Sequence, residues 1–181
     1  MYIGVGLLEG KTVNLRVMEK EDLPLSAEWR NITDFWGGFE SILQMSRADL
    51  EKMLANLSAE WKWFIVETKD GSKVGFINHR PAGKAQELGY AILPSERGKG
   101  YGAEATLIMV DYLFLTIDIV RIQAHTGAGN KASQRVLEKA GFKREGTIRK
   151  VAFVKGEWTD SYLYGILREE WKDSKILTKT A

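Results

Sequence analysis

The sequence predicts a mixed α/β fold in which a central sheet is flanked by helices. Segments with the two-residue alternation of strands are interspersed with segments whose apolar residues recur every three or four positions. In the second half of the chain, strand, helix, strand and helix follow one another in that order. The 181 residues suit one core, and no internal repeat or Pro-rich linker divides them. We therefore expect a single domain over residues 1–181, with a loose tail after residue 175.

The first half of the chain is expected to contain three strands and two helices. Ser46 is a candidate N-cap for the second helix, because a serine hydroxyl can accept a hydrogen bond from a free N–H of the first turn. Asp70-Gly71 predicts a tight hairpin, since such a turn needs positive φ angles. The expected strands span residues 12–17, 63–67 and 73–78, and the helices span 22–31 and 47–57.

The second half should contain four strands and two helices. Pro94 ends the first of these strands, and Gly141 ends the second helix. A final hairpin turns around Lys155-Gly156. The expected strands are 87–93, 120–126, 147–154 and 158–167. One helix is marked by Ala105, Ile108, Met109, Tyr112 and Leu113, and the other spans 130–140.

Composition excludes several classes of function. The 26 basic and 24 acidic residues give a net charge of +2, which offers no reason to expect a nucleic-acid partner. Without cysteine there is no disulfide, thiolate metal site or cysteine nucleophile. His79 and His125 lie too far apart to suggest a metal site. Residues 1–11 are too short and glycine-broken for a secretory signal, and no apolar run has membrane-spanning length. We expect a cytoplasmic protein with no membrane partner.

A glycine-rich turn between a strand and a helix is the strongest candidate for a binding site. It contains Gly98, Gly100 and Gly102, which let the backbone approach a ligand closely. The following helix N-terminus offers free N–H groups, and Arg97 and Lys99 add positive charge, so the turn could hold a pyrophosphate. The alternative is that the two cations form a solvated loop patch. The turn matches neither a P-loop nor a dinucleotide-binding fingerprint.

Three motifs resemble those of one known family. Arg97-x-x-Gly100-x-Gly102 fits the R/Q-x-x-G-x-G/A pyrophosphate signature of the GNAT superfamily of N-acetyltransferases. Asn130-x-x-Ser133 and Gly141-Phe142 follow at the expected distance, as in the RimJ/RimL-like branch. The resemblance implies an acetyl-CoA-dependent transferase whose sheet has about seven mostly antiparallel strands and a V-shaped split between two of them.

The resemblance also implies roles for individual residues. Backbone groups around Ile92 and Leu93 would bond the pantetheine arm and polarise the thioester carbonyl. Asn130 would contact the cofactor arm, although asparagine is also a preferred N-cap. Ser133 would protonate the departing thiolate. The pyrophosphate would be held by Arg97, Gly98, Lys99, Gly100, Tyr101 and Gly102.

The general base is less well determined by the sequence. Some relatives use a glutamate in the strand before the loop, and Glu87 is the nearest match here. A base from the final hairpin would fall near Ala152, which cannot accept a proton. His125, Asp160 and a water relay are the remaining alternatives.

The resemblance implies that the acceptor is an amine and that Trp36 and Phe39 border its pocket. The alternative is that these two side chains belong to the hydrophobic core. A protein N-terminal amine is the leading acceptor, and a polyamine, amino acid or aminoglycoside is the alternative. Transfer should be direct within a ternary complex, by a monomer or homodimer. Two other hypotheses are a catalytically silent acyl-CoA sensor and a mononucleotide-binding module.

Overall fold

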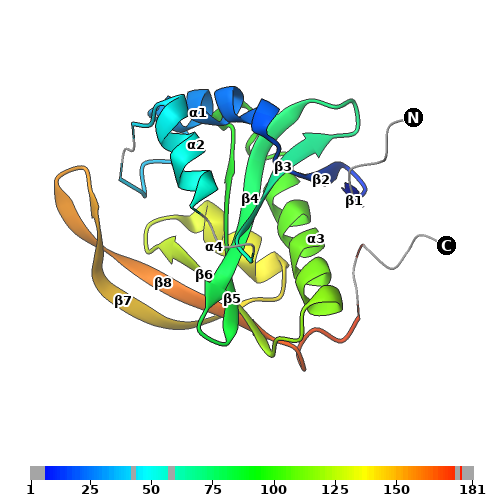
Figure 1. Ribbon diagram of the computed structural model, residues 1–181. Helices are drawn as coiled ribbons and strands as arrows, with labels where there is room; N and C mark the ends of the chain where they lie inside the picture. Colours follow the sequence, from blue (N-terminus) through cyan, green and yellow to red (C-terminus); the bar gives the residue numbers. More distant parts are fainter. Residues whose placement is uncertain (1–6, 42–43, 57–59, 174–175, 177–181) are drawn as a thin grey trace, which may run out of the picture.

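A computed structural model describes residues 7–41, 44–56, 60–173 and 176 of the chain, and in it the strands form one sheet of eight. The strand order is β1-β2-β3-β4-β5-β6-β8-β7 (Figure 1). Every neighbouring pair is antiparallel except β5 and β6. The strands are β1 (Leu7–Glu9), β2 (Val13–Val17), β3 (Lys62–Thr68), β4 (Lys73–Ala82), β5 (Ala85–Ile92), β6 (Arg121–Gly127), β7 (Lys143–Val154) and β8 (Glu157–Leu167).

In the part of the chain that the structure describes, four α-helices accompany this sheet: α1 (Leu23–Asn31), α2 (Arg47–Ala55), α3 (Tyr101–Thr116) and α4 (Lys131–Lys139). The mixed α/β prediction is confirmed. Ser46 caps α2 as expected, with its hydroxyl accepting the Asp49 N–H. The last residue of the predicted helix 47–57 and the predicted tail after 175 lie outside the described residues, apart from Ile176.

The predicted strand count was low by one, because β1 was missed. Three residues are too few to show the alternation that marks a strand. β4 also runs beyond its predicted end and includes Pro81. Pairing with β3 stops at His79, so Pro81 lies where β4 has a partner on one side only. A proline, which has no N–H to donate, is tolerated at such a place.

The two faces of the sheet bury different clusters. Phe64 of β3 packs with α3 residues such as Ile108 and Leu113, whereas the next residue, Ile65, packs on the opposite face with Trp29 of α1. Side chains alternate between the faces of a strand, so α1 and α2 cover one face while α3 and α4 cover the other. Below, these are called the α1–α2 face and the α3–α4 face.

The sheet splits where its only parallel pair diverges. β5 and β6 pair only through Gln86 with Ile122 and Glu87 with Gln123. From Leu88 onward β5 pairs with β4 alone, while β6 remains paired with β8 along its length. This arrangement is the V-shaped split that the sequence predicts, and it leaves two facing backbone edges free.

Within the described ranges, no helix has the length and apolar character needed to cross a membrane.

Candidate active site

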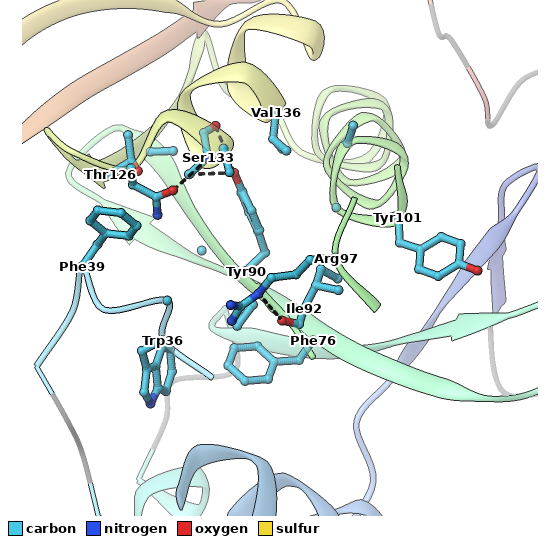
Figure 2. Close-up of a pocket in the computed structure, with 18 of the residues that line it drawn as sticks. Trp36, Phe39, Phe76, Tyr90, Ile92, Arg97, Tyr101, Thr126, Ser133 and Val136 are labelled. Carbon is cyan, nitrogen blue, oxygen red and sulfur yellow. Dashed lines mark hydrogen bonds between the residues drawn. The ribbon is translucent and has the colours of Figure 1, made fainter. Parts of the chain in front are cut away.

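The split opens into a cavity of about 740 Å³ between the end of β5, the start of α3 and the start of α4. Residues from the segment after α1 close its other side (Figure 2). Most of the predicted site residues line this cavity: Trp36, Phe39, Ile92, Arg97, Gly98, Gly100, Tyr101, Gly102, Asn130 and Ser133. Three predicted residues, Glu87, Leu93 and Lys99, do not line it.

The glycine turn has the backbone geometry expected of an anion site. Gly98 and Gly100 adopt φ angles of 79° and 88°, in the left-handed region where glycine is favoured. Gly100 is the N-cap of α3, and the first N–H groups of a helix have no partner within it. A helix N-terminus also carries a partial positive charge. The turn can therefore bind a phosphate through its backbone alone.

The Arg97 guanidinium binds the protein itself. Its Nη2 donates to the carbonyls of Asp34 and Phe35 at 2.7 and 2.8 Å, and its Nε donates to the Ile92 carbonyl at 3.2 Å. Arg97 therefore fastens the segment after α1 to the end of β5. Lys99, the other predicted cation, pairs with Glu96 at 2.8 Å.

The backbone of Leu93 is already occupied by hydrogen bonds within the fold. Its N–H donates to the Val74 carbonyl, and its own carbonyl accepts the N–H of Glu96. Ile92, one residue earlier, lines the cavity. The backbone groups open to a ligand therefore lie before Leu93, toward the middle of β5.

Ser133 is held close to a tyrosine that sequence reasoning did not select. Asn130 caps α4 by accepting the Ser133 N–H at 3.1 Å, and the Ser133 hydroxyl lies 2.9 Å from the Tyr90 hydroxyl. Burial raises the pKa of Tyr90 to about 12, despite the opposing hydrogen bond with Ser133. The Tyr90 hydroxyl therefore stays protonated at neutral pH, and the hydroxyls of Tyr90 and Ser133 can both donate hydrogen bonds. The alternation of β5, which turns Tyr90 toward α4, could have identified it.

Glu87 lies at the base of the split. Arg80 contacts its Oε1 through Nε at 3.1 Å, and Gln123 donates to its Oε2, also at 3.1 Å. The Nε2 of His125 lies 3.2 Å from the same Oε2. Burial alone would raise the pKa of Glu87, but the hydrogen bonds from Arg80 and Gln123 and nearby positive charge hold that pKa below its ordinary value. The carboxylate is therefore firmly anionic.

One alternative base, Asp160, lies on the β7–β8 hairpin, and the position of Ala152 on the same hairpin offers no proton acceptor. Asp160 accepts the backbone N–H of Lys150, a residue with the positive φ angle of 47°. Ala152 pairs with Thr159.

Aromatic side chains form the wall of the cavity on the α1–α2 face. Trp36 meets the ring of Phe76 edge-on, with centroids 6.0 Å apart. The Arg30 guanidinium lies behind this wall, 4.5 Å from the ring centroid of Trp63 and 4.6 Å from that of Phe76. Arg30 is 3% exposed, and burial lowers its pKa to about 10, so it remains charged at neutral pH. Phe39 packs on the glycines of the β6–α4 turn and closes the wall.

Comparison with known proteins identifies the family to which this chain belongs. Residues 12–143, well over half of the chain, match the acetyltransferase (GNAT) domain family. The chain is a GNAT N-acetyltransferase. The predicted RimJ/RimL-like branch is also confirmed by the family that matches.

Several known N-acetyltransferases resemble this chain in sequence or in fold. The probable N-acetyltransferase YjcK of Bacillus subtilis is 31% identical over 181 residues, covering 91% of this chain and 98% of that protein. RimJ of Mycobacterium smegmatis, solved with a CoA disulfide, is 26% identical with a TM-score of 0.76, covering 90% and 85% of the two chains. Spermidine N-acetyltransferase of Vibrio cholerae, solved with CoA and spermine, is 22% identical with a TM-score of 0.82, covering 90% and 99%. The similarity to the spermidine N-acetyltransferase shows that the two chains share a fold.

Metal ligands do not gather in this acetyltransferase as far as the structure describes it: no group of three or more His, Asp or Glu side chains there could hold an ion.

Proposed function

We propose that this acetyltransferase transfers the acetyl group of acetyl-CoA directly to a primary amine within a ternary complex. The observation that carries this proposal is the free backbone edge of β5, which leads to the glycine turn and the start of α3. An extended ligand with amide groups can pair with such an edge as an added strand does. Its phosphates would then reach the N–H groups from Gly98 to Gly102.

The chemistry follows from where the cavity places polar groups. Acetyl transfer develops negative charge on the thioester oxygen, and a free N–H of β5 near Ile92 can stabilise that charge. The leaving sulfur would lie near Tyr90 and Ser133, whose hydroxyls can hydrogen-bond to a departing thiolate. Asn130 keeps Ser133 in place by capping α4.

For the acceptor we propose a protein N-terminal amine beside an apolar first side chain, which Trp36 and Phe39 would contact. In the described part of the cavity lining, Glu40 and Glu96 are the carboxylates, and Glu96 already pairs with Lys99. A polyamine or aminoglycoside brings several positive charges that need several carboxylates. The buried charge of Arg30 behind the aromatic wall also disfavours a second cation there.

The test begins with calorimetric titration of acetyl-CoA into the purified protein. Acetyl transfer is then followed by thiol release, which reports CoA alone because the chain has no cysteine. The acceptors are a peptide with a free N-terminal amine and an apolar first residue, the same peptide with a blocked N-terminus, and spermidine.

We expect binding at micromolar concentration and a kcat/KM for the free peptide at least about tenfold above that for spermidine, a difference of about 1.4 kcal/mol. A preference for spermidine would overturn the acceptor assignment. Binding without turnover on any amine would favour the silent acyl-CoA sensor, and binding of ATP in place of acetyl-CoA would favour the mononucleotide module.

A further inference from the structure

We infer that His125 is the general base of this site and that Glu87 positions it. This inference rests on the proposed acetyl transfer to an amine. It assigns the base to β6 and gives the carboxylate of β5 an indirect role.

The position of His125 suits a base that meets the acceptor. Its side chain is 35% exposed and lines the cavity. The Nε2 faces the Glu87 carboxylate, so the neutral ring carries its proton on Nε2 and leaves the lone pair on Nδ1. Within the described ranges Nδ1 has no hydrogen-bond partner. It is thus free to accept a proton from a bound amine.

Glu87 is poorly placed to be the base itself. Its side chain is 15% exposed and does not line the cavity. Both carboxylate oxygens are engaged, Oε1 by Arg80 and Oε2 by Gln123 and His125. A carboxylate held by a guanidinium resists protonation, but it stabilises a neighbouring imidazolium well. A carboxylate that orients a histidine and stabilises its charged form is a recurrent arrangement in enzymes.

The two faces of the sheet separate this pair from the hydroxyl pair. Ala124, beside His125, is buried in the core on the α3–α4 face, so alternation turns His125 to the α1–α2 face, where the aromatic wall lies. Tyr90 packs on the α3–α4 face and meets Ser133 there. An amine entering along the aromatic wall would therefore find the base on its own side and the hydroxyls beyond the thioester.

The acceptor nitrogen loses two protons in the reaction, one before it attacks the thioester and one after. The acceptor reaches the site as an ammonium, and His125 Nδ1 takes one proton and releases it to solvent. The nitrogen lone pair then attacks the thioester carbon and forms the C–N bond. The C–S bond breaks, and its electron pair leaves with sulfur as a thiolate that Tyr90 and Ser133 hydrogen-bond. The second nitrogen proton passes to Nδ1, giving the neutral amide.

The charges around His125 come from several elements. Glu87 of β5 lies beside it and is itself paired with Arg80 of β4, and the ion pair of Arg121 with Glu145 is on the same face, four residues back along β6. Leu163 is its uncharged partner on β8. From the segment after α1, Glu40 lines the same cavity. Since the free imidazole is the active form of a histidine base, kcat/KM should fall on the acidic side of the profile.

The experiment measures pH profiles of kcat/KM for the free peptide with wild type, His125→Gln, His125→Ala and Glu87→Gln. His79→Asn is the matched control, because His79 is the other histidine and is buried on the opposite face beside Phe64 and Tyr112. Circular dichroism and acetyl-CoA titration accompany each variant. Imidazole is added to His125→Ala to test for rescue.

We expect both His125 variants to lose about 100-fold or more in kcat/KM, in the range for general base catalysis, and to lose the acidic limb of the profile. Acetyl-CoA affinity should stay within twofold, imidazole should restore part of the rate, and His79→Asn should keep the limb. Glu87→Gln should lose about tenfold in kcat/KM and retain the fall of the profile on the acidic side.

Two results would overturn the inference. His125 variants within twofold of wild type at every pH would exclude His125 as the base. Loss of the limb in Glu87→Gln alone would return the base to Glu87. A wild type that binds acetyl-CoA but acetylates nothing would instead refute the proposed function, so the two failures are distinguishable.

Discussion

Replacing Arg97 with alanine should destabilise the protein by a calculable amount. The guanidinium bonds three backbone carbonyls, those of Asp34, Phe35 and Ile92. Each such hydrogen bond is worth about 1 kcal/mol net. The ion pair with the Asp34 carboxylate is largely exposed and adds little. Arg97→Ala should therefore lower the free energy of unfolding by about 2 to 3 kcal/mol.

Thermal unfolding measures this loss. For a chain of this size, 1 kcal/mol corresponds to about 2 to 4 °C, so Tm should fall by about 4 to 12 °C. Lys99→Ala is the control, because Lys99 lies in the same turn and makes one exposed ion pair with Glu96. Its Tm should change by less than about 2 °C. If the two variants shift Tm equally, Arg97 does not anchor the segment after α1 and the reasoning fails.

Acetyl-CoA binding by the same two variants separates anchoring from direct phosphate contact. If the backbone N–H groups of the turn hold the pyrophosphate, Arg97→Ala should weaken binding by less than about tenfold, with little dependence on salt. A direct guanidinium–phosphate contact would give a larger loss that shrinks as salt rises.

Three further predictions concern the turn, the hydroxyl pair and acid stability. Gly100→Ala should lower the free energy of unfolding by about 1 to 2 kcal/mol, because φ is 88°, and should also weaken acetyl-CoA binding in calorimetry. Gly71→Ala is the control: its φ is 84° in a remote hairpin, so the stability should fall by the same amount while acetyl-CoA binding stays unchanged. Tyr90→Phe should slow acetyl transfer, measured as thiol release, about tenfold with little change in acetyl-CoA affinity. An unchanged rate would show that the Tyr90 hydroxyl takes no part in the reaction. Burial alone would raise the pKa of Asp22, but hydrogen bonds, led by the one from Arg16, hold that pKa well below its ordinary value. The ionised Asp22 therefore stabilises the fold fully above about pH 4, and this contribution is lost as the pH falls further. Asp22→Asn should therefore lose stability at pH 7 and show a flatter acid limb in urea titrations; a parallel limb would contradict this.

The sequence identified the glycine turn well because its signal is local. Positive φ at Gly98 and Gly100 is a property of single residues, and the residues directly after them determine where the helix begins. The N-cap at Asn130 is local in the same way. Such features need no knowledge of which strands are neighbours.

The contacts of the site side chains could not be predicted from local sequence, because they depend on strand register and on the packing of distant segments. Glu87 contacts Gln123 only because β5 and β6 pair at that point, 36 residues apart in sequence. Tyr90 meets Ser133 across a separation of 43 residues. Arg97 was expected to offer its charge to a phosphate, yet it bonds a segment 62 residues earlier. A register error of one residue in β5 would have changed the contacts of Glu87 and Tyr90, and the Arg97 contact depends on how two distant loops pack.

The split itself explains why an extended ligand suits this fold better than a compact nucleotide. Each side of the split is supported by an antiparallel neighbour, β4 for β5 and β8 for β6, so the edges can stay apart without losing their strands. Their free N–H and C=O groups would cost about 1 to 3 kcal/mol each if buried without partners. A ligand with alternating amide donors and acceptors can form the hydrogen bonds that water otherwise makes to these groups. A planar nucleotide base would leave several of these groups without a hydrogen bond. The same split lets the two edges present different chemistry, with hydroxyls beyond β5 on the α3–α4 face and an imidazole from β6 on the α1–α2 face. A thioester lying between the edges would therefore be open to an amine from one side while its sulfur leaves toward the other.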